Sequence, residues 1–366
     1  MKVEANKDFP ILPHIRSHHG YVPGEQPDNT GWIKLNTNEN PYPPSAKVRD
    51  AISSQVDGLR LYCSPDGKPF RESIAAYHGI DASQVILGNG SDDILNVLAR
   101  AFVGSGNARL GTLVPQYSLY PVLTSLQGGE LEEIEFTEDF QLPIEKISNS
   151  SSPIFFITSP NAPTGVGFKN EDLRNVLENY SGLLVVDEAY ADFADQNAVE
   201  LLSEFSNVFI TRTFSKSYSL AGLRVGYGLG HPDLINVLHG VRDVYNLDRL
   251  AQAGGQAALE DHDWFLHCRD KVLKSRLELT SRLDERGWYT YPSQANFIFT
   301  EPKDVAGNSG PNVASSLFEF LKSQNILLRY FPKHPLTDRF LRITIGTDSE
   351  MKTLHKAIDQ WLTKEY

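Results

Sequence analysis

The chain has 366 residues, of which 40% are hydrophobic, so it is long enough to bury the core of two domains or of one large α/β domain. Its formal net charge of −12 argues against nucleic acid and anionic membranes as partners, because both attract basic surfaces. Cys63 and Cys268 match no metal-binding or disulfide pattern. No segment has the apolar character of a signal peptide or of a membrane span, so we expect a reducing, cytoplasmic location.

Short apolar runs alternate with longer segments of helical periodicity. The runs predict strands over residues 84–87, 154–158, 183–186 and 208–211. A helix is predicted over 93–102, with Ser91 as its N-cap after the break at Gly88-Asn89-Gly90. Continuously apolar strands separated by helix-length segments are typical of a mostly parallel sheet with both faces covered.

The pattern changes after a long predicted helix from His262 to Arg286. It then predicts a compact α+β unit with strands over 296–300, 326–331 and 341–345, a helix near 313–324 and a terminal helix from Ser349. Pro, Gly and Asn are frequent in the first forty residues, which favours an extended arm. We therefore expect an arm over 1–40, a large domain over 41–261 and a small domain over 262–366.

Polar side chains follow several predicted strands at their carboxyl ends, where open α/β sheets bind ligands. Lys216 comes soon after the strand that ends near residue 211. A lysine that is partly desolvated or lies near other cations has a lowered pKa and can attack a carbonyl carbon. Thr213, Ser215 and Arg224 could bind a phosphate. The alternative for Lys216 is an ordinary solvated loop lysine.

Two further segments follow predicted strands in the same way. Ser91 and Asp92 start a predicted helix, whose unpaired N–H groups suit a phosphate, although an ordinary capped turn would look the same. Asp187 ends a buried strand, where a carboxylate is costly unless it is paired. It could pair with a protonated pyridine nitrogen, with Tyr190 in reach of the same site, or serve as a helix cap or structural ion pair.

Tyr117 and Arg342 complete the candidate set. Tyr117 could lay its ring on a flat cofactor, or be a plain core or surface tyrosine. Arg342 lies in a predicted strand and could bind a substrate carboxylate, or face solvent. Taken together, a carbonyl for the lysine, a phosphate for the helix start and Arg224, and a pyridine nitrogen for the aspartate indicate pyridoxal 5′-phosphate as cofactor.

These residues lie in motifs that resemble those of the fold-type I, class II aminotransferases, and among them most the histidinol-phosphate aminotransferases. The resemblance runs nearly end to end, over residues 35–42 (LNTNENPY), 88–92 (GNGSD), 159–165 (SPNAPTG), 186–190 (VDEAY), 215–224 (SKSYSLAGLR) and 341–347 (LRITIGT). It implies the fold of PLP-dependent transferases of type I, in which a large domain with a mostly parallel mixed sheet carries a smaller α+β domain.

The resemblance also implies roles at the cofactor ring. Lys216 would bind the cofactor aldehyde covalently and later move a proton, Asp187 would contact the pyridine nitrogen and Tyr190 the 3′ oxygen. Many relatives have a second asparagine that touches the same oxygen, where this chain has Ala162. Either Asn161 takes over that contact from one residue earlier, or Tyr190 holds the oxygen alone.

Further positions match contacts to phosphate and substrate. Tyr117 would stack on the ring, and the cofactor phosphate would be held by Ser91, Asp92, Thr213, Ser215, Arg224 and, from the neighbouring subunit of a homodimer, Tyr62. Arg342 would bind the α-carboxylate of glutamate, and Arg329 and Tyr21 match positions that contact the distal phosphate of the substrate.

The reaction that this resemblance implies is the interconversion of L-histidinol phosphate and 2-oxoglutarate with imidazole-acetol phosphate and L-glutamate, a step of histidine biosynthesis. An aminotransferase for aromatic or varied amino acids and a phosphothreonine-type decarboxylase are the alternatives on the same scaffold. A dinucleotide-binding protein is disfavoured, because residues 226–230 (GYGLG) lack the G-x-G-x-x-G spacing. A non-catalytic binding protein would leave the combination of Lys216, Asp187 and Arg224 unexplained.

Overall fold

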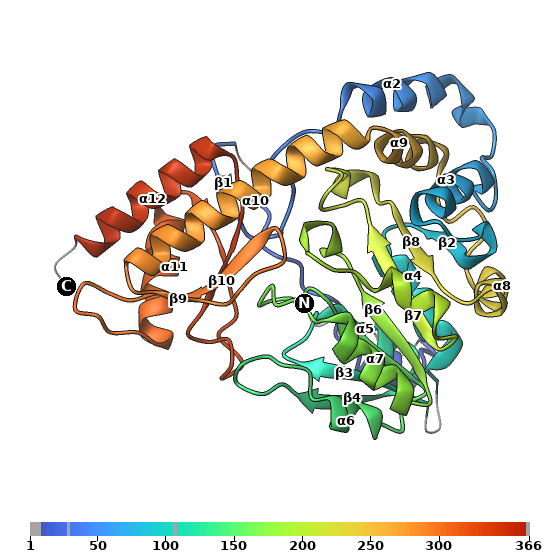
Figure 1. Ribbon diagram of the computed structural model, residues 1–366, viewed down its shortest axis with the longest axis horizontal. Helices are drawn as coiled ribbons and strands as arrows, with labels where there is room; N and C mark the ends of the chain where they lie inside the picture. The colour runs from blue at the N-terminus through green and yellow to red at the C-terminus, as the bar shows by residue number, and fades with distance from the viewer. Residues whose placement is uncertain (1–8, 28–29, 105–107, 364–366) are drawn as a thin grey trace.

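The computed structural model describes residues 9–27, 30–104 and 108–363, and these contain a seven-stranded sheet (Figure 1). The strand order is β2 (Val85–Gly88), β8 (Gly226–Leu229), β7 (Val208–Thr213), β6 (Leu183–Asp187), β5 (Ile154–Thr158), β3 (Arg109–Val114) and β4 (Glu130–Glu135). β8 runs antiparallel to both neighbours, and the other neighbouring pairs are parallel. The expected mostly parallel mixed sheet is confirmed, and the predicted strands differ from the observed ones by at most two residues at an end.

Helices cover both faces of this sheet, because successive apolar side chains of its strands point to opposite sides. Ile154 and Phe156 pack in one hydrophobic cluster, and Phe155 and Ile157 pack in another. The helices over the first cluster are α4 (Ser91–Phe102), α5 (Leu119–Leu126) and α8 (Pro232–Val241). Those over the second are α2 (Ala46–Gln55), α3 (Lys68–His78), α6 (Ile144–Ser148), α7 (Asn170–Asn179) and α9 (Arg249–Glu260).

A smaller lobe is built around an antiparallel four-stranded sheet. Its strand order is β12 (Arg329–Tyr330), β13 (Leu341–Thr344), β10 (Phe297–Glu301) and β9 (Tyr289–Thr290), and α10 (His262–Glu285), α11 (Pro311–Ser323) and α12 (Asp348–Leu362) accompany it. The prediction of one strand over 326–331 is wrong. The segment forms β11 (Ile326–Leu327), which pairs with β1 (Ile33–Lys34), and then β12, which joins the larger sheet of this lobe.

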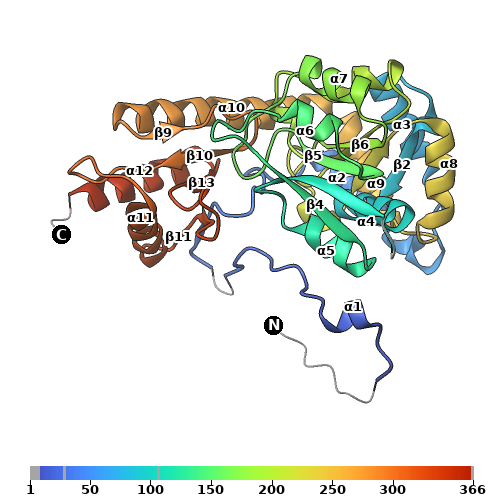
Figure 2. The same ribbon diagram turned by 90° about the horizontal axis from the view of Figure 1, so that it is seen from below.

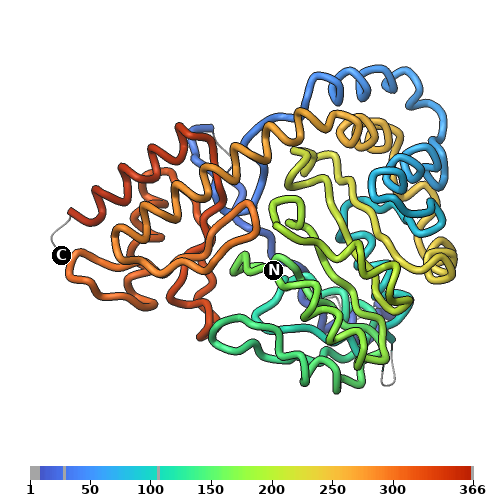
Figure 3. The backbone as a smooth tube through the Cα atoms, in the orientation of Figure 1, coloured from blue at the N-terminus to red at the C-terminus, as the bar shows by residue number. Residues whose placement is uncertain are grey.

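Helix α10 connects the two lobes, and Figure 3 shows it running from one into the other. Phe265, in its first turn, packs in the core beneath the seven-stranded sheet, whereas Val272 and Leu283 pack in the core of the small lobe. The expected change of organisation after Asp261 falls at the N-cap of this helix. The domain boundaries themselves stay a prediction.

The N-terminal segment runs along the outside of the lobes (Figure 2). It contains the short helix α1 (Pro13–Arg16), and His18 Nδ1 lies 3.0 Å from Ser125 Oγ in α5. The predicted arm therefore includes some regular structure, and its residues 1–8 and 28–29 lie outside the described ones. Short 3₁₀ helices occupy Val56–Arg60, Ala82–Gln84, Ala191–Phe193, Ala198–Ser203 and Ala221–Leu223. No helix among the described residues has the length and apolar character needed to cross a membrane.

Candidate active site

The start of α4 forms a close junction with β8 and Arg224. Gly90, with φ +82°, is the N-cap of the helix, so the prediction that Ser91 caps it is wrong: the serine is the first helical residue. A Cβ on Gly90 would lie 2.5 Å from Arg224 Nη2, and one on Gly226 would lie 2.4 Å from the backbone nitrogen of Ser91. The two glycines therefore allow the guanidinium and the N–H groups of the helix start to converge on one small space, which suits an anion.

Four of the predicted phosphate-binding residues are connected by hydrogen bonds around this space. Arg224 donates from Nη1 to Ser215 Oγ over 3.3 Å and from Nη2 to Asp92 Oδ2 over 3.1 Å. Thr213 Oγ1 donates to Ser215 Oγ over 2.9 Å. Asp92 and Arg224 lie 132 positions apart in the sequence, and the fold brings them into contact.

Tyr117 lies beside the same cluster. Its hydroxyl donates to Asp92 Oδ1 over 3.3 Å, so Asp92 links the tyrosine to Arg224. The ring of Tyr117 meets the ring of Tyr21 edge-on, with 6.1 Å between the centroids. The N-terminal arm therefore brings Tyr21 to the candidate site.

Asp187, at the end of β6, is 3% exposed and accepts hydrogen bonds from two side chains. Tyr120 Oη donates to Oδ2 over 2.8 Å, and Thr211 Oγ1 donates to Oδ1 over 3.1 Å. Burial raises the pKa of Asp187 to about 6, while both hydrogen bonds act in the opposite direction because they favour the charged form. No positive side chain forms an ion pair with Asp187 within the described part of the chain, so the carboxylate is free to bind a cationic group of a ligand.

Lys216 lies in the loop after β7, where its backbone and its amine are both held. Nζ donates to the carbonyl oxygen of Thr37 over 3.0 Å, and Asn40 Nδ2 donates to the carbonyl oxygens of Lys216 and Ser217, each over 3.0 Å. Burial, aided by the positive charge of Arg342, lowers the pKa of Lys216 to about 8. The neutral amine, which can attack a carbonyl carbon, is therefore much more populated near neutral pH than that of an exposed lysine.

Tyr190 and the segment that contains Ala162 lie together. Tyr190 Oη accepts a hydrogen bond from Asn38 Nδ2 over 2.9 Å, and burial raises the pKa of the tyrosine. Ala162 packs in the same small hydrophobic cluster as Tyr190, so it presents a methyl group there. Asn161 is buried, and its Oδ1 accepts hydrogen bonds from the backbone N–H and the hydroxyl of Thr164. This side chain therefore stabilises its own turn.

Arg329 and Arg342 face each other across neighbouring antiparallel strands β12 and β13. Their guanidinium carbons lie 5.4 and 5.3 Å from the centre of the Phe331 ring. Arg342 Nη2 donates to the carbonyl oxygen of Asn36 over 2.8 Å, but its buried Nε has no hydrogen-bond partner among the described residues. Burial lowers the pKa of Arg342 to about 10. Two neighbouring cations, one of which has a buried N–H without a hydrogen-bond partner among the described residues, are suited to an anionic ligand.

Tyr62 lies apart from the other candidates. Its side chain is 81% exposed and stacks on Tyr245, with ring centroids 4.6 Å apart. Its predicted contact, to the phosphate of a neighbouring subunit, is not a contact within one chain and stays a prediction.

Three side chains of this site were not singled out in the sequence: Tyr120, Thr211 and Asn38. Thr211 ends a predicted strand, and Asn38 lies within the 35–42 motif, so position and motif gave a signal for both. Tyr120 gave none, because its contact with Asp187 joins α5 to β6 only in the folded chain. The site as a whole fits a flat anionic cofactor with a basic ring nitrogen and a carbonyl group.

The chain is similar to known aminotransferases both in sequence and in structure. The family model of class I and II aminotransferases matches residues 30–358. The histidinol-phosphate aminotransferase of a Synechocystis species is 43% identical over 348 residues, which cover 95% of this chain and 97% of that protein. The enzyme of the same name from Citrifermentans bemidjiense is 42% identical over 350 residues, covering 95% and 97%.

Among solved structures, that of histidinol-phosphate aminotransferase from Sinorhizobium meliloti in complex with pyridoxal-5′-phosphate superposes with a TM-score of 0.87. It is 25% identical to this chain, and the match covers 98% of each chain.

Proposed function

The chain belongs to the family of class I and II aminotransferases, and we propose that it exchanges the amino group between L-histidinol phosphate and 2-oxoglutarate with pyridoxal 5′-phosphate as cofactor. The products are imidazole-acetol phosphate and L-glutamate. The proposal is supported by relatives of that name at 42–43% identity over nearly the whole chain. Within the site, the observation that carries it is the facing pair Arg329 and Arg342, because each substrate brings at least one anionic group to that pair.

The cofactor supplies an electrophilic aldehyde and an electron-accepting ring when it is bound. Its phosphate would be held by the side chains and N–H groups around the start of α4, namely Ser91, Asp92, Thr213, Ser215 and Arg224. The carboxylate of Asp187 would keep a proton on the ring nitrogen, since a buried negative charge favours a cation beside it. Tyr117 would cover one face of the ring, and Tyr190, itself bonded to Asn38, would donate to the ring oxygen.

Lys216 would carry the proton transfers. Its amine would hold the aldehyde group of the cofactor. Its pKa of about 8 lies close to physiological pH, so the amine would be able to accept the proton from the substrate carbon that bears nitrogen and to donate a proton again. The two half-reactions would use the same residues in opposite directions, so we expect ping-pong kinetics.

The arginine pair would orient both substrates. Glutamate and 2-oxoglutarate carry two carboxylates, whereas histidinol phosphate carries a phosphate and no carboxylate. Arg342 would bind the α-carboxylate in bidentate fashion, and Arg329 with Tyr21 would bind the distal phosphate. One cationic region thereby serves two different anions.

We further propose a homodimer in which Tyr62 reaches the phosphate site of the other copy. Tyr62 is surrounded in sequence by the exposed apolar side chains Val56, Leu59 and Leu61 and is stacked on Tyr245. An exposed apolar surface of this kind is typical of an interface. The cytoplasmic location stays a prediction.

The decisive test combines two measurements on the purified protein. Borohydride reduction and peptide mapping are expected to find the cofactor attached to Lys216. Absorbance titration with histidinol phosphate, phenylalanine and phosphothreonine, each without 2-oxoglutarate, is expected to convert the cofactor fully only with histidinol phosphate. A label at another residue would overturn the site, preferred reaction with phenylalanine would indicate an aromatic aminotransferase, and release of CO2 from phosphothreonine would indicate a decarboxylase.

A further inference from the structure

A buried ion network lies directly behind the proposed cofactor contacts. Arg212, in β7, is 4% exposed. It donates from Nε to Glu188 Oε2 over 2.7 Å and from Nη1 to Asp192 Oδ1 over 2.8 Å. The second oxygen of Asp192 accepts a hydrogen bond from the hydroxyl of Ser217.

Each partner in this network lies one or two positions from a residue of the candidate site in sequence. The pairs are Asp187 with Glu188, Tyr190 with Asp192, and Lys216 with Ser217. Arg212 itself follows Thr211, which contacts Asp187, and successive side chains of a strand point to opposite faces. The guanidinium therefore lies on the opposite side of the sheet from that contact. There it connects the segments that carry Asp187, Tyr190 and Lys216.

The cost of this arrangement argues that its geometry matters. Burying a guanidinium and two carboxylates removes them from water, and such networks contribute little to stability compared with apolar packing. Burial would lower the pKa of Arg212, but the two carboxylates outweigh it and raise the pKa, so the arginine stays charged. A planar guanidinium binds two carboxylates at fixed positions, which a lysine ammonium cannot do.

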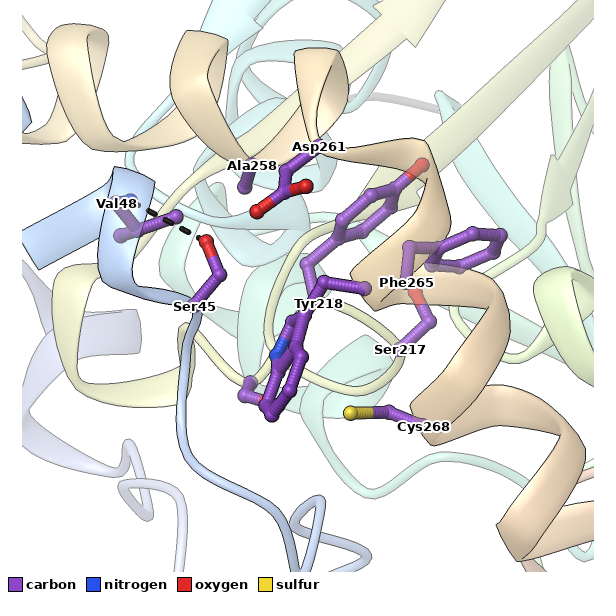
Figure 4. Close-up of a pocket in the computed structure, with 10 residues that line it drawn as sticks. Ser45, Val48, Ser217, Tyr218, Ala258, Asp261, Phe265 and Cys268 are labelled. Carbon is purple, nitrogen blue, oxygen red and sulfur yellow. Dashed lines mark hydrogen bonds between the residues drawn. The ribbon is translucent and has the colours of Figure 1, made fainter.

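The lysine loop is also held on its other sides. Asn40 binds two of its carbonyl oxygens. Tyr218 stacks on Phe265 of α10 with 4.6 Å between ring centroids, and Figure 4 shows Ser217 and Tyr218 of this loop beside α10. Breaking the Ser217–Asp192 contact therefore removes the link to the segment that carries Tyr190 while these other contacts remain.

We propose that Arg212 is a positioning residue, which acts through Glu188, Asp192 and Ser217 to hold Asp187, Tyr190 and Lys216 at fixed mutual distances. This inference rests on the proposed function, because it concerns the same lysine. Arg212 touches neither substrate nor cofactor in this arrangement. Its contribution is to the alignment of the amine with the carbon from which it removes a proton, a step that a misplacement of about 1 Å can slow by about 100-fold.

The test uses the variants Arg212→Lys, Ser217→Ala and the double variant, with Arg174→Lys as the matched control. Arg174 also binds two carboxylates, Glu200 and Glu204, but at the surface of α7. We expect kcat to fall about 10-fold in both single variants with KM changed less than about 3-fold, because alignment affects the reacting state more than binding. The control should match the wild type.

Two further readouts separate positioning from a general loss of structure. The double variant should be no slower than the slower single variant, since both changes break one path. In the cofactor-free protein, competitive labelling should give Lys216 a pKa near 8 in the wild type and a higher pKa in both single variants, because a loosened loop admits water around the ammonium. Ser217→Ala should keep the circular dichroism spectrum of the wild type and melt above the assay temperature, so a loss of activity there cannot be attributed to unfolding.

The inference is overturned if both single variants keep the wild-type kcat and lysine pKa, or if their losses add in the double variant. Borohydride mapping of the wild type distinguishes the two proposals. A label away from Lys216 contradicts the proposed function, whereas a label on Lys216 together with unaffected variants contradicts the positioning role alone.

Discussion

The hydroxyl of Tyr120 donates a 2.8 Å hydrogen bond to Asp187 Oδ2, and both side chains are buried. The bond opposes the effect of burial, which alone would favour the protonated carboxyl group. Tyr120 therefore helps to keep Asp187 charged at the pH at which a cationic ring nitrogen has to be bound.

Replacing Tyr120 by phenylalanine should raise the pKa of Asp187 above its value of about 6. As pH falls through that pKa the carboxylate takes up a proton and loses its attraction for the ring nitrogen. Cofactor binding to the variant should thus begin to weaken at a higher pH than in the wild type. Fluorescence titration of the cofactor-free protein between pH 5 and 8 measures this. Tyr180→Phe, which removes a buried hydroxyl bonded to the Ser152 carbonyl oxygen, is the control, and equal pH dependence in all three proteins would contradict the prediction.

Replacing Arg329 by leucine should lower the activity with histidinol phosphate more than the activity with phenylalanine. The change removes one of the two facing cations, so we expect kcat/KM for histidinol phosphate to fall at least about 100-fold, the loss typical of a charged hydrogen-bonding partner of a substrate anion. Slow amino transfer from phenylalanine, which has no second anion, should persist. Arg339→Leu, which breaks an ion pair with Glu301, is the control. Equal losses with both donors would show that Arg329 does not recognise the distal phosphate.

Replacing Gly226 by alanine should damage the phosphate site. The new Cβ would lie 2.4 Å from backbone atoms of Gly90 and Ser91, so the start of α4 has to move away from β8. We expect the dissociation constant of the cofactor to rise at least about 10-fold, with a loss of stability of about 1–3 kcal/mol from overpacking. Gly222→Ala, in the same part of the chain and with no atom within 4 Å of the new Cβ, should leave both unchanged. Equilibrium dialysis and thermal unfolding test this. Tight binding of the cofactor by the Gly226 variant would argue against a phosphate site at the start of α4.

The sheet was predictable where strand sequences are continuously apolar. β5 begins and ends at the predicted residues, because a fully buried parallel strand leaves a run such as IFFIT between polar turns. Lys216 and Asp187 were found for a related reason: charged groups directly after such a run need a partner, and ligands bind at that edge.

Features that depend on partners far along the chain were not predictable in the same way. Residues 326–331 read as one strand, but Leu328 separates two short strands that pair with different sheets, and no local pattern specifies those partners. Ser91 resembled an N-cap by residue type. The conformation of Gly90, required by its approach to Arg224, moves the cap one residue earlier.

Helix α10 has 24 residues and, at 1.5 Å per residue, is about 36 Å long. One end of this helix packs near the lysine loop through the stacking of Phe265 on Tyr218. The rest of the helix packs in the lobe that carries Arg342. If the small lobe tilted on binding an anion, this helix would carry the displacement to the lysine loop. Binding of the charged end of a substrate and placement of the Lys216 amine would then be coupled through one rigid element.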